Sequence, residues 1–355
     1  MKLPTWPAMC SSLSPASCAL RIRLAAIALS VSLAGCGSAA TTAELSGEAL
    51  GTTFSVQIVD TGGGFDRQRL REEILDALAE IDRRFSTWRD DSDVSRFNAS
   101  RSTAWQPVPA LVCDAVTRAL QISVATGGAF DVTVGPLVEL WGFGRRQANE
   151  MPDDSAIDRL MPAIGHEKLE TDCSRPALRK RHRELAVDLS GFAKGLAADL
   201  VAERLDADGQ RRYLVEIGGE IRARGRNARG RLWAIAIENP VEPGGEPVAV
   251  ISLANGGLAT SGDYRNRIEF ASGPVSHILD PRSGRPAAHA LASVTVLAES
   301  AAAADGFATA LLVMGADDGL RFAAERGLAA SLHVKTDEGV RQITTPAFEA
   351  RENAR

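Results

Sequence analysis

The chain has 355 residues, a formal net charge of -5 at pH 7 and 45% hydrophobic residues. Its basic residues form no cluster interleaved with aromatic residues, which argues against nucleic acid as a partner. Beyond the N-terminal region only Cys113 and Cys173 remain, without CxxC or Cys/His zinc spacing; this excludes a disulfide scaffold and allows at most one disulfide.

Residues 1–35 are predicted to be a lipoprotein signal peptide. Arg21 and Arg23 precede an uncharged apolar stretch of about ten residues, which is too short to span a bilayer of about 30 Å. The sequence Leu33-Ala34-Gly35-Cys36 follows and resembles a lipobox, in which the cysteine receives a diacylglycerol. We expect Cys36 to be the lipidated N-terminus of a membrane-anchored protein facing the periplasm, with Gly37 slightly favouring the outer membrane. A plain secretory signal or a short membrane anchor is the alternative.

Residues 36–46 comprise the lipidated cysteine and a small, polar stretch that suits a flexible tether. The fold is predicted to start near Gly47. Residues 53–58 alternate between polar and apolar, the period of a half-buried strand, and a glycine-rich turn at 62–64 follows. A helix is expected from about Asp66, with an apolar stripe of Leu70, Ile74, Leu78, Ile81 and Phe85.

The middle of the chain is predicted to contain two further helices. The first covers residues 111–125 and ends at Thr126-Gly127-Gly128, where glycine permits a positive φ. Residues 129–144 look like a loop. Residues 186–189 are read as a strand that enters a helix capped by Ser190, with Phe192, Leu196, Leu200 and Leu205 facing inward.

From Tyr213 the pattern becomes rich in strands. Strands are expected at 213–217, 221–224, 233–238, 248–253, 292–297 and 330–334, turns at 218–219 and 255–256, and helices at 300–314 and 317–326. Helices and strands mix without a regular βαβ rhythm, which predicts an α+β domain over residues 47–340, followed by a C-terminal tail at 341–355. Four scattered histidines, His166, His182, His289 and His333, are expected at the surface or in loops.

The familiar motifs for phosphate loops, dinucleotides, hydrolases and zincins are absent. Four polar or glycine-rich clusters remain. Residues 86–98 are expected to form a capped turn with an exposed aromatic residue, whereas the glycines and aromatics of 126–144 suggest close approach to a flat ligand.

The other two clusters suggest phosphate and metal chemistry. Residues 188–195 open a helix, where free amides and Lys194 favour a phosphate. Asp305 and Thr309 lie four apart on one helix face and offer hard oxygen ligands to Mg²⁺. A buried helix cap and an ordinary helix surface are the alternatives.

Taken together and in order, these clusters resemble the ApbE family of FAD:protein FMN transferases, over residues 47–334. The matching pieces are 50–53, 86–88 with 95–98, 127–131 through Gly144, 188–195, 213–220, 261–266, 277–281, and 304–305 with Thr309. The resemblance implies an ApbE-like, T-fold-like, two-lobed domain of mixed antiparallel sheets and helices, with the FAD cleft between the lobes.

The resemblance also implies a reaction. A divalent cation, Mg²⁺ with Mn²⁺ possible, neutralises the pyrophosphate of the substrate FAD. A threonine hydroxyl of an exported flavoprotein subunit of a respiratory redox complex attacks the FMN-side phosphorus, and AMP leaves. Alternatives are a FAD pyrophosphatase that yields FMN and AMP, a non-catalytic FAD-binding lipoprotein, and a lipid-tethered structural protein.

Carried over by motif, Asp305, Thr309 and the carbonyl of Gly191 would hold the metal. The FAD site would comprise Leu50, Trp88, Ala129, Phe130, Asp131, Asp188, Lys194 and Ile278. The family often has methionine at Leu50 and tyrosine at Trp88. His277 and Arg265, together with Asp305, are the candidate catalytic residues; a purely structural role is the alternative for His277. Residues 213–220 are expected to be scaffold, and Asp280-Pro281 a turn.

Overall fold

The computed structural model describes residues 40–60, 64–264, 266–271 and 273–352. Its centre is an eight-stranded sheet of order β1-β2-β6-β7-β10-β15-β16-β17, in which every neighbouring pair runs antiparallel. The strands are β1 (Thr41–Ala49), β2 (Thr52–Asp60), β6 (Tyr213–Ile217), β7 (Glu220–Arg224), β10 (Gly256–Gly262), β15 (Leu291–Ala298), β16 (Ala329–Thr336) and β17 (Gly339–Thr344).

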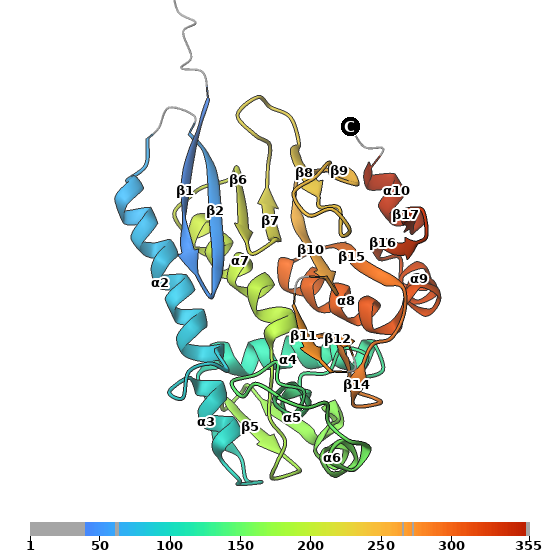
Figure 1. Cartoon of the computed structure of the whole chain (residues 1–355). Coiled ribbons are helices and arrows are strands. Elements are labelled where there is room, and N and C mark those ends of the chain that lie inside the picture. Colours follow the sequence, from blue (N-terminus) through green and yellow to red (C-terminus); the bar gives the residue numbers. More distant parts are fainter. Residues whose placement is uncertain (1–39, 61–63, 265, 272, 353–355) are drawn as a thin grey trace, which may run out of the picture.

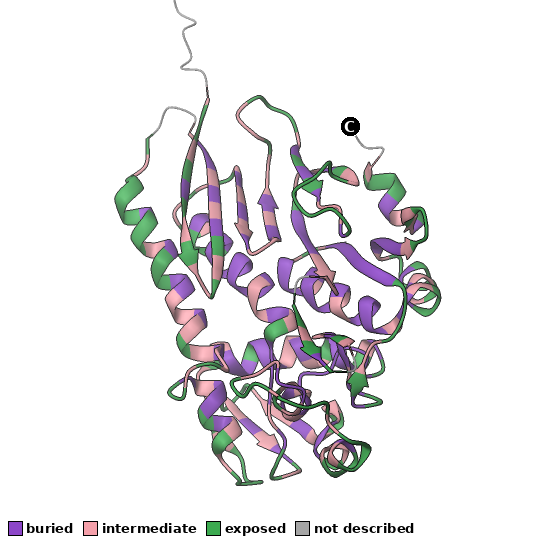
Figure 2. Ribbon diagram, viewed as in Figure 1, coloured by how far each residue is buried: buried purple, intermediate pink, exposed green. Residues whose placement is uncertain are grey.

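Apolar layers cover both faces of this sheet. One face packs against helices α2 (Arg67–Phe85), α7 (Ser190–Ala207), α8 (Ala301–Met314) and α9 (Ala316–Glu325). The other packs against a two-stranded ribbon, β8 (Trp233–Ile237) with β9 (Ala249–Leu253), and helix α10 (Pro346–Glu352). Strand β15 is therefore buried along almost its whole length, as Figure 2 shows.

Smaller elements gather at one end of the large sheet, in the lower half of Figure 1. They are α3 (Asp93–Ala99), α4 (Ala110–Ala125), α5 (Gly135–Leu140), α6 (Asp154–Leu160), two 3₁₀ turns (Met161–Ala163 and His166–Lys168), the sheet β3 (Gln106–Pro107)-β5 (Ala177–Lys180)-β4 (Leu169–Asp172), and the hairpins β11 (Arg267–Phe270)-β12 (Gly273–Ser276) and β13 (Leu279–Asp280)-β14 (Arg285–Pro286). A disulfide joins Cys113 on α4 to Cys173 after β4.

The long periodic elements agree with the sequence. Helix α2 begins after Asp66, whose carboxylate accepts from the amides of Gln68 (3.1 Å) and Arg69 (3.0 Å), and its predicted stripe is buried. Helix α4 ends at glycines with φ of 59° and 80°, as predicted for Gly127 and Gly128. The predicted strands and helices after Tyr213 are present, with ends shifted by one or two residues.

Two boundaries are corrected. The tether predicted through residue 46 is wrong for residues 41–46, because they pair with β2 in strand β1 and bury Leu45. The predicted tail is also wrong, because residues 341–344 complete β17 and α10 buries Phe348 in the apolar layer beneath β8 and β9. Cys36 and the signal peptide lie outside the described residues.

The segment before α7 also differs from expectation. Residues 186–189 form only one isolated bridge, between Val134 and Ala186, rather than a strand. Ser190 is the first residue of α7 and caps nothing; its amide donates instead to the Asp188 carboxylate at 2.7 Å. The segment read as a loop contains the short helix α5. In the described residues, no helix is both long and apolar enough to cross a bilayer.

The histidine prediction is wrong at one position, His333. His333 is fully buried on β16, where its Nδ1 lies 3.2 Å from the Ser293 hydroxyl. His166 is half-buried, and its amide (2.8 Å) and Nδ1 (3.1 Å) contact the carboxylate of Asp131.

Candidate active site

A cavity of about 440 Å³ opens where the large sheet meets the smaller elements. Its walls come from segments that are far apart in the sequence: the β1–β2 turn, residues 129–138, the start of α7, the β6–β7 turn, the end of β10, residues 277–281 and α8. The predicted site residues that line it are Leu50, Ala129, Phe130, Asp131, Asp188, Gly191, Lys194, His277, Ile278, Asp305 and Thr309.

Three predicted residues are not among the lining residues. Trp88 is 68% exposed on the turn before α3, where its amide donates to the Ser86 hydroxyl. Arg265 and Cys36 lie outside the described residues. The roles assigned to all predicted site residues therefore remain predictions, although most of them meet at one cavity.

The β1–β2 turn brings a strained residue to the cavity edge. Leu50 has φ of 55°, the only positive φ outside glycine within the described ranges, and Gly51 follows with φ of 71°. A left-handed leucine costs about 1 kcal/mol or more, so the surrounding structure must hold it there. Its half-buried side chain packs against the main core.

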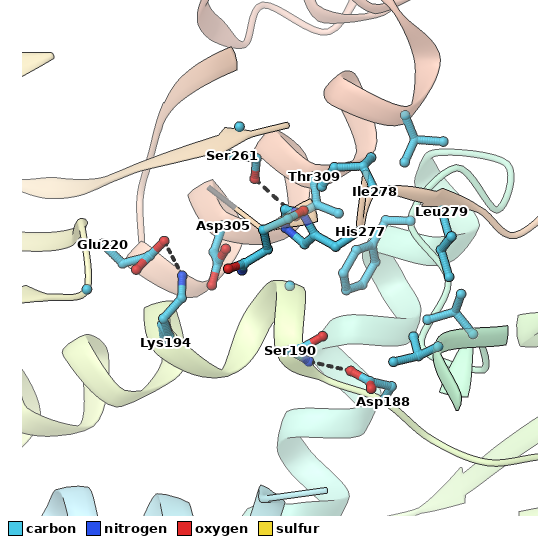
Figure 3. Close-up of a pocket in the computed structure, with 18 of the residues that line it drawn as sticks. Asp188, Ser190, Lys194, Glu220, Ser261, His277, Ile278, Leu279, Asp305 and Thr309 are labelled. Atoms are coloured by element: carbon cyan, nitrogen blue, oxygen red, sulfur yellow. Dashed lines mark hydrogen bonds and ion pairs between the residues drawn. The ribbon is translucent and has the colours of Figure 1, made fainter. Parts of the chain in front are cut away.

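Helices α7 and α8 approach each other closely at the cavity floor. Gly191 departs from helical geometry, with φ of -84° and ψ of 21°, and a Cβ there would lie 2.9 Å from Oγ1 of Thr309. Thr309 Oγ1 lies 3.1 Å from the Ser261 hydroxyl (Figure 3). Asp305 Oδ2 accepts from the Gly195 amide at 3.1 Å. The predicted metal ligands thus lie at one close contact between α7 and α8, which we call the α7–α8 junction.

Lys194 forms an ion pair with Glu220 at the same end of the cavity. Glu220 is 2% exposed, and burial raises the pKa of its carboxyl, an effect that the Lys194 ammonium opposes. Burial likewise raises the pKa of Asp305, and Lys194 again opposes it. Two buried carboxylates therefore share one ammonium.

Glu220 is the residue that sequence reasoning missed, since residues 213–220 were expected to be scaffold only. Strand alternation gives no sign of it, because both Glu220 and Ile221 are buried at the start of β7. Its position directly after the tight Gly218-Gly219 turn was the available signal: Gly218, with φ of 61°, also lines the cavity.

His277 is held by main-chain contacts. Its amide donates to the Asn266 carbonyl at 3.2 Å, and its Nδ1 lies 3.0 Å from the same oxygen. A carbonyl only accepts, so Nδ1 must carry the proton, and Nε2 has the lone pair when the ring is neutral. Burial lowers the pKa of His277, which favours that neutral form.

Asp131 lines the cavity, but its carboxylate is occupied by the protein. Oδ1 accepts from the amide (2.8 Å) and hydroxyl (2.7 Å) of Thr133, while Oδ2 faces the amide and ring of His166. Asp131 therefore shapes the wall of the cavity by tying residues 131–133 to the turn at His166.

The junction fits a hard divalent cation. Asp305, Thr309 and the Gly191 carbonyl supply the oxygen types that Mg²⁺ prefers. The two buried carboxylates exceed the single ammonium, so added positive charge would reduce the electrostatic cost of burying them. Over the described ranges, no group of three His, Cys, Asp or Glu side chains is placed to hold a metal, so the site would depend on one carboxylate and neutral oxygens.

Comparison with known proteins matches residues 50–332 to the model of the ApbE family. A Vibrio cholerae protein named FAD:protein FMN transferase is 40% identical over 93% of this chain and 98% of its own length. Its namesake from Haemophilus influenzae is 39% identical over 91% of this chain and 95% of its own. The chain belongs to the ApbE family.

Solved structures agree with this assignment. The flavin transferase ApbE from Vibrio cholerae superposes with a TM-score of 0.80 at 39% identity, covering 88% of this chain and 99% of its own. The apo form of the Pseudomonas stutzeri flavinyl transferase ApbE gives 0.81 at 38% identity, covering 89% and 98%. The predicted ApbE-like α+β fold and the prediction of a transferase enzyme are confirmed.

Proposed function

We propose that this chain transfers FMN from FAD to a threonine hydroxyl of a partner protein, with release of AMP and dependence on Mg²⁺ or Mn²⁺. The observation that carries the proposal is the junction of α7 and α8, where Gly191, Asp305, Thr309 and Lys194 meet at the cavity that His277 also lines. The names of the relatives support the same activity.

The residues that line the cavity have different roles in the proposed reaction. Asp305, Thr309 and the Gly191 carbonyl would hold the cation, which when bound supplies positive charge to the pyrophosphate oxygens. Lys194 provides a second positive charge for the same phosphates. Leu50, Phe130 and Ile278 offer apolar contacts for the flavin and adenine parts of FAD.

We assign His277 the role of proton acceptor. The threonine oxygen forms a bond to the FMN-side phosphorus, the bond between that phosphorus and the bridging oxygen breaks, and AMP leaves with that oxygen. The threonine proton passes to Nε2 of His277, the nitrogen left unprotonated by the contact to Asn266. No covalent intermediate on the enzyme is required.

We also propose that the protein is a lipoprotein, anchored through Cys36 and facing the periplasm, with the outer membrane slightly favoured. The disulfide between Cys113 and Cys173 supports an oxidising compartment, because such bonds rarely persist in the cytosol. The acceptor would then be an exported flavoprotein subunit of a respiratory redox complex.

Hydrolysis of FAD to FMN and AMP is the second candidate activity, because in the same cavity water would replace the threonine hydroxyl as the attacking group. A FAD carrier is less favoured, since both Asp305 and Thr309 are retained beside Lys194.

The deciding experiment weighs an acceptor protein intact. The chain from Gly37 onward, which keeps β1 whole, is mixed with FAD, Mg²⁺ and an exported threonine-containing flavoprotein domain. The acceptor should gain the mass of FMN minus water with wild type and metal, but not with Asp305→Ala. Free FMN with unmodified acceptor would support the hydrolase, and intact bound FAD the carrier.

A further inference from the structure

Three buried or half-buried charged groups meet at one end of the cavity. They are Lys194 on α7, Glu220 at the start of β7 and Asp305 on α8. Figure 3 shows the ammonium of Lys194 between the two carboxylates, with its ion pair directed to Glu220. The position of the ammonium therefore decides which carboxylate it neutralises.

Asp305 is fixed in place beside this ammonium. Its Oδ2 accepts from the amide of Gly195, the residue that follows Lys194. Because the two residues are adjacent on α7, the base of the lysine side chain cannot move away from Asp305 without breaking this junction. Only the direction of the flexible lysine side chain remains to be set.

Packing alone does not explain why a charged glutamate occupies position 220. Its Oε2 is buried and has no hydrogen-bond partner among the described residues, while Oε1 contacts Lys194. A buried carboxylate oxygen without a hydrogen-bond partner costs stability, and an apolar side chain of similar size would avoid that cost. The negative charge itself is therefore the feature that needs an explanation.

We propose that Glu220 is a positioning residue that anchors Lys194 and keeps its ammonium off Asp305, so that the Asp305 carboxylate stays available to a divalent cation. The inference rests on the proposed function, because it assumes that Asp305 holds the metal. An ammonium and a divalent cation compete for the same carboxylate. Anchored on Glu220, the ammonium still lines the cavity and can face a phosphate without blocking the metal site.

Metal binding tests this directly. Mn²⁺ alone is titrated into the purified chain from Gly37 onward, and free Mn²⁺ is measured by electron paramagnetic resonance. Glu220→Gln should weaken Mn²⁺ binding about tenfold, because Lys194 then turns to Asp305. Lys194→Met should bind Mn²⁺ as well as wild type or better, since the competing ammonium is gone.

The double variant separates anchoring from a general charge effect. In the Lys194→Met background, Glu220→Gln should weaken Mn²⁺ binding much less than it does alone. An equal loss in both backgrounds, or no loss in either, overturns the proposal. Glu170→Gln, which removes a carboxylate paired with Arg179 away from the cavity, is the matched control and should leave Mn²⁺ binding unchanged.

Two further variants separate a folding defect and a missing metal site from the effect of Glu220 itself. If Glu220→Gln does not fold, Glu220→Asp replaces it, because its shorter side chain withdraws the carboxylate from Lys194 and predicts the same weakening. Asp305→Ala should abolish Mn²⁺ binding. If it binds Mn²⁺ like wild type, or if wild type binds none, the metal site in the proposed function fails, and the role of Glu220 fails with it; loss of the Glu220 effects alone, with Asp305→Ala abolishing binding, overturns only the role of Glu220.

Discussion

The main-chain amide of Gly195 on α7 donates a hydrogen bond to the Asp305 carboxylate on α8, over 3.1 Å. In a regular helix this amide would donate a hydrogen bond to the carbonyl of Gly191, four residues earlier. Gly191, however, does not have helical backbone angles. The start of α7 is therefore shaped by its contact with α8. The predicted metal ligands on the two helices are held in one arrangement by this bond.

Gly195→Ala should separate the two helices. A Cβ at residue 195 would lie 2.4 Å from the carbonyl oxygen of Ala301, which is main chain and cannot rotate away. We expect a loss of about 2 kcal/mol or more in the free energy of unfolding, and loss of FMN transfer. Thermal melting and the intact-mass assay check both; a variant with wild-type stability and transfer would show that the helices are not in close contact.

Asp199→Ala should weaken the position of α8 more than Ser300→Ala does. The Asp199 carboxylate, buried on α7, accepts from the amides of Ala301 (2.9 Å) and Ala302 (3.0 Å) at the start of α8. Ser300 caps only the amide of Ala303, at 3.1 Å.

We expect about 2 kcal/mol of destabilisation for Asp199→Ala and about 1 kcal/mol for Ser300→Ala, by chemical denaturation. Since Asp199, unlike Ser300, links α8 to α7, the Mn²⁺ affinity should fall with Asp199→Ala and stay near wild type with Ser300→Ala. Equal effects of the two variants on Mn²⁺ would contradict a role for Asp199 in aligning the helices.

Reduction of the disulfide should destabilise the smaller elements. Cys113 and Cys173 are 60 residues apart, so opening the bond releases a long loop in the unfolded chain. The chain-entropy model gives about 4 kcal/mol for a loop of this length, an upper value for the expected loss. Melting with and without dithiothreitol measures it, and the Cys113→Ser/Cys173→Ser variant should melt at the reduced midpoint and not respond to dithiothreitol.

The sequence predicted elements that have a strong period and missed those set by distant contacts. The stripe from Leu70 to Phe85 needs one buried face, and α2 has it. Strand β1 reads as a tether because its residues are small and polar; it is a strand because β2 offers nine paired positions. Partners of this kind cannot be found by local periodicity.

The site residues show the same contrast between those that local spacing predicts and those that distant contacts bring together. Asp305 and Thr309 lie one helical turn apart, so their shared face follows from spacing alone. Glu220 comes to the cavity because β7 pairs with β10, whose other neighbour β15 leads into α8. The contact of His277 with Asn266 depends on the β11–β12 hairpin, which no periodic pattern announced. Tertiary pairing, rather than local propensity, determined what was missed.

The fully buried His333 should make stability depend on mildly acidic pH. Burial lowers the pKa of its imidazole to about 4, against about 6.5 in an unfolded chain. Between these values the unfolded chain binds a proton that the folded chain does not, so stability is complete above about pH 7 and falls as pH drops towards 4. The loss approaches about 3 kcal/mol, the energy equivalent of that pKa difference.

Chemical denaturation at pH 7.5 and 5 measures this loss as the difference in the free energy of unfolding between the two pH values. The difference should be smaller for His333→Gln than for wild type. His182→Gln, in a turn outside the large sheet, should keep the wild-type difference. Parallel pH profiles for wild type and His333→Gln would mean that the buried imidazole is protonated in the folded protein.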